Sequence, residues 1–202
     1  MNHKRLGGLL WIANFQYFIV QAIVASAWQT PFSLRTNTIS DLGNTVCGPY
    51  GQDYVCSPLH VLMNVSFICL GLTMIIGATL LMRGQTTRHR TGLFLLAIAG
   101  VGTILVGLFP ENGIGALHAV AAALPFVLGN VALLLLANHP LQPRWLRMAT
   151  YVSAIIALLC LVGFLTGYTP VLLKGGIERI VAYPQTIWMM AFGFYAFRRV
   201  AK

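Results

Sequence analysis

Long apolar stretches alternate with short polar segments along the whole chain. Six of these stretches are predicted to cross a membrane as helices, at residues 6–28, 58–82, 92–110, 115–137, 148–168 and 178–197. Each is close to the roughly 20 apolar residues that a helix needs to span about 30 Å of hydrocarbon. An even number of crossings places both termini on one side. The predicted fold class is therefore all-α: one integral membrane domain, residues 1–202, forming a six-transmembrane-helix bundle.

Composition supports this assignment. The chain is 57% hydrophobic and only 8% charged, with a mean hydropathy of +0.77. A water-soluble domain of this size cannot bury so much apolar surface, so a soluble globular class is excluded. The only long connection between the predicted spans is residues 29–57, and connections of this length in compact proteins are often functional. We expect it to be an ordered lid over one end of the bundle.

The net charge of +9 is distributed unevenly between the two sides of the predicted bundle. One side carries ten basic residues: Lys4, Arg5, Arg83, Arg88, Arg90, Arg144, Arg147, Arg198, Arg199 and Lys202. The other side carries Arg35, Lys174 and Arg179, together with all four acidic residues, Asp41, Asp53, Glu111 and Glu178. The positive-inside rule then predicts cytoplasmic N- and C-termini in a plasma membrane. The basic charge indicates orientation and contact with anionic membrane lipids, not nucleic-acid binding.

Two of the four cysteines lie in the long loop between the first two predicted helices. Cys47 and Cys56 fall on the outer side, where thiols are oxidised, and Gly48 and Pro49 between them allow the chain to bend. We therefore predict a disulfide that closes this outer loop.

Polar residues that are rare elsewhere in the chain occur at the outer ends of the predicted spans. Ser57 and Pro58 are typical of a helix start, which places His60 in the first turn and Asn64 one turn deeper. In the stretch F-P-E-N-G-I-G-A-L-H, residues 109–118, a proline ends one helix. Glu111 then lies in a tight turn, and His118 begins the next helix.

Ionisable side chains at the membrane boundary are costly to place without partners or water. We therefore predict an outward-facing polar pocket. Its members are Asp41 from the long loop, His60, Asn64, Glu111, His118, and the pair Glu178 and Arg179 at the start of the last span. The simpler interpretation is that these residues only anchor helix ends at the level of the lipid head groups.

The predicted pocket would bind a lipid head group or another amphiphile. Modification of that ligand would use His118 or His60 as a general base, with Asp41 or Glu178 as the orienting carboxylate. Arg179, Asn64 and Glu111 would bind the substrate. No metal site is predicted outright. Zinc or haem b, if bound, would use His60 and His118.

Three other functions fit the same residues: a small-solute transporter or sensor, an assembly subunit with a partner protein on its outer face, and a haem-binding membrane cytochrome. The sequence does not decide whether the protein is an enzyme.

Polar residues and prolines also occur within the spans. Asn14 and Gln21 share a helix face and are predicted to form hydrogen bonds to neighbouring helices. Pro125 and Pro184 are predicted to bend the helices that contain them.

Four segments carry a family resemblance: T-N-T-I-S-D-L-G-N (36–44), S-P-L-H-V-L-M-N (57–64), G-L-F-P-E-N-G-I-G-A-L-H (107–118) and G-G-I-E-R-I (175–180). In these the chain resembles a bacterial and archaeal six-helix membrane family, domain of unknown function 998. The resemblance covers most of the chain. It implies the six-helix membrane fold in a bacterial or archaeal plasma membrane, but it carries over no activity.

Overall fold

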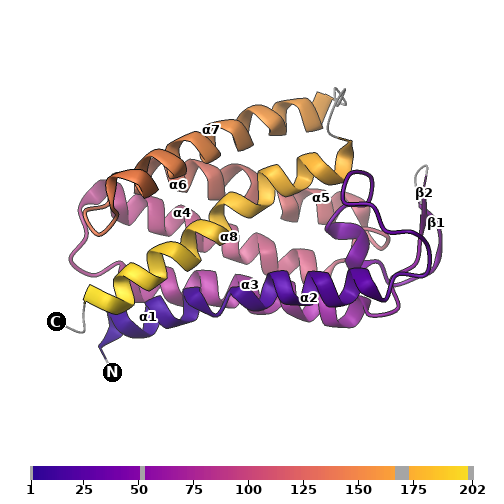
Figure 1. The fold of residues 1–202 in the computed structure, drawn as a ribbon, viewed down its shortest axis with the longest axis horizontal. Helices are drawn as coiled ribbons and strands as arrows, with labels where there is room; N and C mark the ends of the chain where they lie inside the picture. Colours follow the sequence, from indigo (N-terminus) through magenta and orange to yellow (C-terminus); the bar gives the residue numbers. More distant parts are fainter. Residues whose placement is uncertain (1, 51–52, 167–172, 200–202) are drawn as a thin grey trace.

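The computed structural model describes residues 2–50, 53–166 and 173–199 (Figure 1). The helices are α1 (His3–Ile12), α2 (Phe15–Ser26), α3 (His60–Leu81), α4 (Thr87–Leu108), α5 (Gly115–Ala123), α6 (Asn130–Leu136), α7 (Arg144–Thr166) and α8 (Lys174–Arg199). The other elements are a 3₁₀ turn η1 (Ser40–Gly43), a π-helical segment η2 (Leu124–Gly129), and two strands, β1 (Gly48–Tyr50) and β2 (Asp53–Val55).

Five of the predicted spans form helices that are long and apolar enough to cross a membrane: His3–Ser26, His60–Leu81, Thr87–Leu108, Gly115–Leu136 and Arg144–Thr166. The sixth predicted span lies within α8, which is longer, with 26 residues, but less apolar. Figure 1 shows α8 running from the end that carries β1 and β2 to the end that carries both chain termini. We call these two ends the hairpin end and the terminal end.

The helices pack closely where glycines face each other. A Cβ on Gly71 of α3 would lie 2.4 Å from the carbonyl oxygen of Gly100 on α4. A Cβ on Gly8 of α1 would lie 2.7 Å from the carbonyl oxygen of Gly193 on α8. Small residues let helix backbones approach each other in membranes, where the lipid supplies no hydrophobic drive for helices to associate.

The predicted bend at Pro125 takes the form of the π-helical segment η2. Proline has no N–H to donate, so the regular helical bonding cannot continue through it. Gln185 of α8 donates a hydrogen bond to the Pro125 carbonyl at 3.2 Å, and Asn130 donates to the Val181 carbonyl at 2.9 Å. These contacts tie the irregular segment to α8, which itself continues through Pro184.

The predicted hydrogen bonds between helices are confirmed at both positions. Thr73 of α3 donates to the side-chain oxygen of Asn14, at the break between α1 and α2. The hydroxyl of Tyr183 on α8 donates to the Gln21 side chain at 2.8 Å. Nearer the terminal end, the buried rings of Trp11, Trp188 and Phe192 pack together, with centroids 4.8–5.8 Å apart.

The long loop is ordered by three kinds of contact. The Cys47–Cys56 disulfide is present, which confirms that prediction, and it closes the antiparallel β1–β2 hairpin. Lys174 of α8 forms an ion pair with Asp53 at 2.8 Å. Arg179 donates to the loop carbonyls of Leu34 at 3.2 Å and Asn37 at 2.7 Å. Residues 37–44 are all buried, so the loop folds into the hairpin end of the bundle.

Candidate functional site

The loop is held at the hairpin end by a local turn that its own sequence specifies. The Thr38 N–H donates to the Asp41 carboxylate at 2.7 Å, and the Asp41 N–H donates to the Thr38 hydroxyl at 2.9 Å. This reciprocal pair is a capping box with aspartate in place of glutamate. It fixes η1 and with it the position of Ser40.

The Ser40 hydroxyl joins two side chains that come from separate helices. Its oxygen lies 2.9 Å from Glu178 Oε1 on α8 and 3.1 Å from His118 Nε2 on α5. The other Glu178 oxygen accepts a hydrogen bond from the Ile39 N–H. Ser40, His118 and Glu178 are all at least nine-tenths buried. A loop, α5 and α8 therefore meet at one hydrogen-bonded group, which we call the Ser40 relay.

Two proton arrangements place a hydrogen in both contacts of the Ser40 relay. His118 Nδ1 lies 2.8 Å from the Phe109 carbonyl, which only accepts, so Nδ1 carries a proton. With neutral His118, the Ser40 hydroxyl donates to Nε2 and a protonated Glu178 donates to Ser40. With cationic His118, Nε2–H donates to Ser40 and Ser40 donates to ionised Glu178. The two states hold the same number of protons, so the hydroxyl can pass one between imidazole and carboxyl.

A pair of carboxyl groups lies beside the relay. Burial, together with a hydrogen bond to Asp41 and the charge of that carboxyl, raises the pKa of Glu111 to about 9. Glu111 is therefore protonated at neutral pH and able to donate. The Tyr50 hydroxyl donates to the Glu111 backbone carbonyl at 3.1 Å, and burial also raises the pKa of Tyr50.

These groups form one wall of a cavity of about 280 Å³ at the hairpin end, which we call the chamber. Its polar lining consists of Thr38, Ser40, Tyr50, Glu111, His118 and Glu178. The rest is apolar and comes mainly from α5, η2 and α7: Ala119, Ala122, Ala123, Phe126, Val127, Leu161, Phe164 and Leu165. The chamber thus has a polar end and an apolar body.

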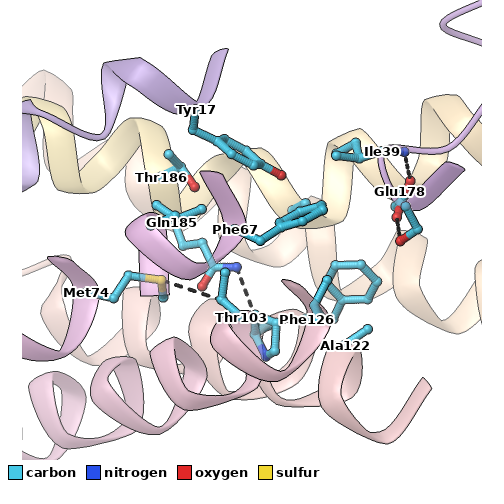
Figure 2. A pocket seen from close by; sticks show the side chains of 15 residues that line it. Tyr17, Ile39, Phe67, Met74, Thr103, Ala122, Phe126, Glu178, Gln185 and Thr186 are labelled. Atoms are coloured by element: carbon cyan, nitrogen blue, oxygen red, sulfur yellow. Dashed lines mark hydrogen bonds between the residues drawn. The ribbon is translucent and has the colours of Figure 1, made fainter. Parts of the chain in front are cut away.

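A smaller cavity of about 40 Å³ lies on the bundle axis beyond the Ser40 relay. Figure 2 shows Glu178 and Ile39 toward one side of it, and Gln185, Thr186 and Thr103 toward the other. Its volume suffices for a few water molecules, each of which needs about 10–15 Å³ by this measure. Ser40, Glu178, Ala122 and Phe126 line both cavities.

Three of the sequence-predicted site residues line the chamber, Glu111, His118 and Glu178, and Asp41 is hydrogen-bonded to Glu111 beside it. Asn64 instead supports the loop, because its amide donates to the Gly43 carbonyl at 2.9 Å. His60 lies at the start of α3, with Nδ1 2.9 Å from the Ser57 carbonyl, and in the described part of the chain no hydrogen bond or ring contact joins it to His118. The prediction that the two histidines approach each other gains no support.

Arg179 is next to Glu178 in sequence but faces elsewhere. Its guanidinium donates to loop carbonyls and to the Gly175 carbonyl at 2.7 Å, and it does not line the chamber. Successive helical residues point about 100° apart, so Glu178 and Arg179 lie on different faces of α8. The predicted substrate-binding role of Arg179 is therefore separate from the Ser40 relay.

Sequence reasoning did not single out Ser40. A signal was present, because threonine followed three residues later by aspartate is a helix-start pattern, and Thr38-Ile39-Ser40-Asp41 fits it. That pattern predicts a turn but does not indicate which neighbouring helices its serine meets.

Both ring nitrogens of His118 have protein partners, the Phe109 carbonyl and the Ser40 hydroxyl. Within residues 2–50, 53–166 and 173–199, no group of three His, Cys, Asp or Glu side chains is arranged to hold a metal ion.

The five apolar spans, the ordered loop and the chamber define a multi-pass helical membrane protein with a polar site at one end. The chain belongs to the family described as "Protein of unknown function (DUF998)", whose model matches residues 12–195. This match confirms the resemblance found in the sequence. No curated protein and no solved structure matches the chain.

Proposed function

We propose that the chamber binds an amphiphile, with its polar end at the Ser40 relay and its apolar part along α5, η2 and α7. The observation that carries this proposal is the division of one cavity into a hydrogen-bonding wall and an apolar body. Ligand pockets characteristically combine a mostly apolar lining with a few placed polar groups.

The charge of the lining favours an uncharged or cationic polar end. Glu111 and Glu178 line the chamber, whereas none of its described lining residues is lysine or arginine. The nearby cation Lys174 is already paired with Asp53 at 2.8 Å. An anionic head group would find no lysine or arginine partner in this lining and would lie beside the carboxyl group of Glu178, which is unfavourable.

The proposal includes the placement of the protein in the membrane. α8 would make the sixth crossing, the hairpin end would face outward, and both termini would be cytoplasmic in a bacterial or archaeal plasma membrane. The uneven distribution of basic residues supports this orientation. The Cys47–Cys56 disulfide supports it as well, because disulfides persist on the oxidising side of that membrane.

A binding experiment tests the chamber directly. The full chain in lipid nanodiscs is titrated with dodecylglycerol, dodecylamine and dodecyl phosphate, and thermal unfolding is followed. We expect the first two to stabilise the protein and the third to do so weakly or not at all, because ligand binding stabilises the folded state. Ala119→Phe fills the chamber and should abolish the stabilisation.

Val120→Phe is the matched control. Val120 is adjacent on α5, is 65% exposed, and does not line the chamber. Equal stabilisation by all three compounds, or an Ala119→Phe protein that responds like the Val120→Phe protein, contradicts the proposal.

One observation favours a second function, acyl transfer from an ester amphiphile. The 3.1 Å separation of Ser40 Oγ and His118 Nε2 is suitable for a serine nucleophile and its base. Ser40 would attack the ester carbonyl and its proton would pass to His118. The departing alcohol would take that proton, and water would then hydrolyse the acyl-serine.

A fluorophosphonate probe tests this second function. It should label the wild-type chain but neither Ser40→Ala nor His118→Ala. Absence of labelling in the wild-type chain would exclude this chemistry.

A further inference from the structure

A second concave surface lies on the opposite side of α8 from the Ser40 relay. It is a groove of about 420 Å³ between α7 and α8, which we call the α7–α8 groove. Its apolar walls include Leu146, Ala149 and Ile156 of α7, and Ile180, Ile187 and Trp188 of α8. From Arg179 to Trp188 it follows ten helical residues, whose nine rises of 1.5 Å give a length of about 14 Å.

Arg179 lines the hairpin end of this groove and is only 8% exposed. All three hydrogen bonds of its Nη1 go to backbone carbonyls, those of Leu34, Asn37 and Gly175. Its Nε has no hydrogen-bond partner in the described part of the chain. Carbonyl dipoles satisfy N–H groups, but they do not neutralise a charge.

The neighbouring Glu178 interacts with this guanidinium through its charge, but in the described part of the chain it forms no salt bridge with it within 4.0 Å. The two oxygens of Glu178 bond the Ile39 N–H and the Ser40 hydroxyl on the chamber side. Among the described residues, the ion pair within 4.0 Å is that of Lys174 with Asp53. A buried cation at the edge of a membrane is costly without a directly paired anion, which favours an anion supplied from outside the chain.

We propose that the α7–α8 groove binds one anionic phospholipid, with its phosphate on Arg179 and one acyl chain between α7 and α8. The position suits such a ligand, because Arg179 lies at the hairpin end of α8 and the apolar walls extend from it toward the terminal end. Arginine guanidinium groups bind phosphate with short, charge-assisted hydrogen bonds. This site does not depend on the chamber, whose lining favours the opposite charge.

Lipid retention measured by native mass spectrometry tests the proposal. The delipidated full chain is equilibrated with mixed micelles containing equal amounts of phosphatidylglycerol and phosphatidylcholine. We expect one phosphatidylglycerol molecule per chain, retained about tenfold over phosphatidylcholine. A hydrogen bond to a charged group contributes about 1.5–3 kcal/mol, and 1.4 kcal/mol corresponds to tenfold in affinity.

Two variants separate the acyl-chain contact from the charge. Ser153→Phe fills the groove from α7 and leaves residue Arg179 in place. It should reduce retention about tenfold, the factor expected for burial of one or two fewer methylene groups. Val152→Phe is its control, because Val152 is 51% exposed and does not line the groove. Arg179→Gln should bind both lipids equally.

Two results would overturn the proposal: equal retention of the two lipids by the wild-type chain, or unchanged retention by Ser153→Phe. Dimers that form without lipid and disappear in Ser153→Phe would show that a second copy of the chain occupies the groove. If Arg179→Gln loses its fold because the loop contacts are lost, the Ser153→Phe and Val152→Phe pair still decides the question.

Discussion

Ser40 Oγ lies 3.1 Å from His118 Nε2, although the two residues are 78 positions apart in the sequence. This contact brings the long loop onto the first turns of α5. The same hydroxyl lies 2.9 Å from Glu178 Oε1, so one serine connects the membrane helices α5 and α8. Removing the hydroxyl therefore leaves two buried polar groups without their partner.

We expect Ser40→Ala to lower the free energy of unfolding by about 1–3 kcal/mol, the cost of leaving buried hydrogen-bonding groups unsatisfied. Ser40→Thr retains the hydroxyl and should recover part of this loss. Denaturant unfolding in nanodiscs measures both. Ser26→Ala is the control, because that exposed hydroxyl bonds only its own helix, and its effect should stay within about 0.5 kcal/mol. Similar values for Ser40→Ala and Ser26→Ala would contradict the relay.

The pH dependence of stability should show that Glu111 is protonated in the folded protein. Its pKa is about 9 in the folded protein and 4.5 for the unperturbed group. Between these values the folded state retains a proton that the unfolded state has lost, so the stability that Glu111 contributes is complete below pH 4.5 and declines as pH rises toward 9. Glu111→Gln cannot ionise, so its stability curve should be flatter over this window. Parallel curves for wild-type protein and variant would contradict the protonated state.

His139 at the terminal end should make the stability depend on pH in the opposite direction. Burial lowers its pKa to about 4 from 6.5, helped by the charges of His89, Lys4 and Arg147. Its Nε2 donates to Gln85 at 2.9 Å, and its Nδ1 accepts from the Leu141 N–H at 3.2 Å, which requires the neutral ring. Stability should therefore fall as pH drops from 6.5 to 4. His139→Gln should lose this dependence, and thermal unfolding at several pH values measures the difference.

The contact between α3 and α4 should not tolerate a methyl group. A Cβ on Gly71 would lie 2.4 Å from the Gly100 carbonyl oxygen and 2.9 Å from the Ile104 nitrogen, and both are backbone atoms that cannot move aside alone. We expect Gly71→Ala to cost about 1–3 kcal/mol, the range for overpacked cores. Gly115→Ala meets nothing within 4 Å and is the control. Equal melting temperatures for the two variants would contradict the close approach.

Cysteine labelling tests the proposed orientation. In a chain with Cys69 and Cys160 replaced by alanine, Ile114→Cys exposes a thiol at the hairpin end, where Ile114 is 63% exposed. Thr87→Cys exposes one at the opposite end, at the start of α4. A membrane-impermeant maleimide applied to intact cells should label Ile114→Cys, and it should label Thr87→Cys only after lysis. The reverse pattern would invert the topology.

Local sequence determined the elements of this protein. Hydropathy located the helices because crossing hydrocarbon requires a long apolar helix whatever its neighbours are. The spacing of Cys47 and Cys56 was enough to predict their disulfide, and the Phe109–His118 stretch was enough to predict the turn that places His118 at a helix start. The polar end of the bundle was predictable for the same reason, since its charges cannot lie deep in the membrane.

Only the tertiary structure decided which of these polar residues meet. Glu178 and Arg179 are neighbours in sequence, yet one lines the chamber and the other lines the α7–α8 groove. His60 shares its end of the bundle with His118 but contacts the Ser57 carbonyl of its own turn, whereas Ser40 contacts both His118 and Glu178. The physical reason is that the rotation of a helix about its axis and the docking of a loop are set by packing between distant segments, which no local pattern records.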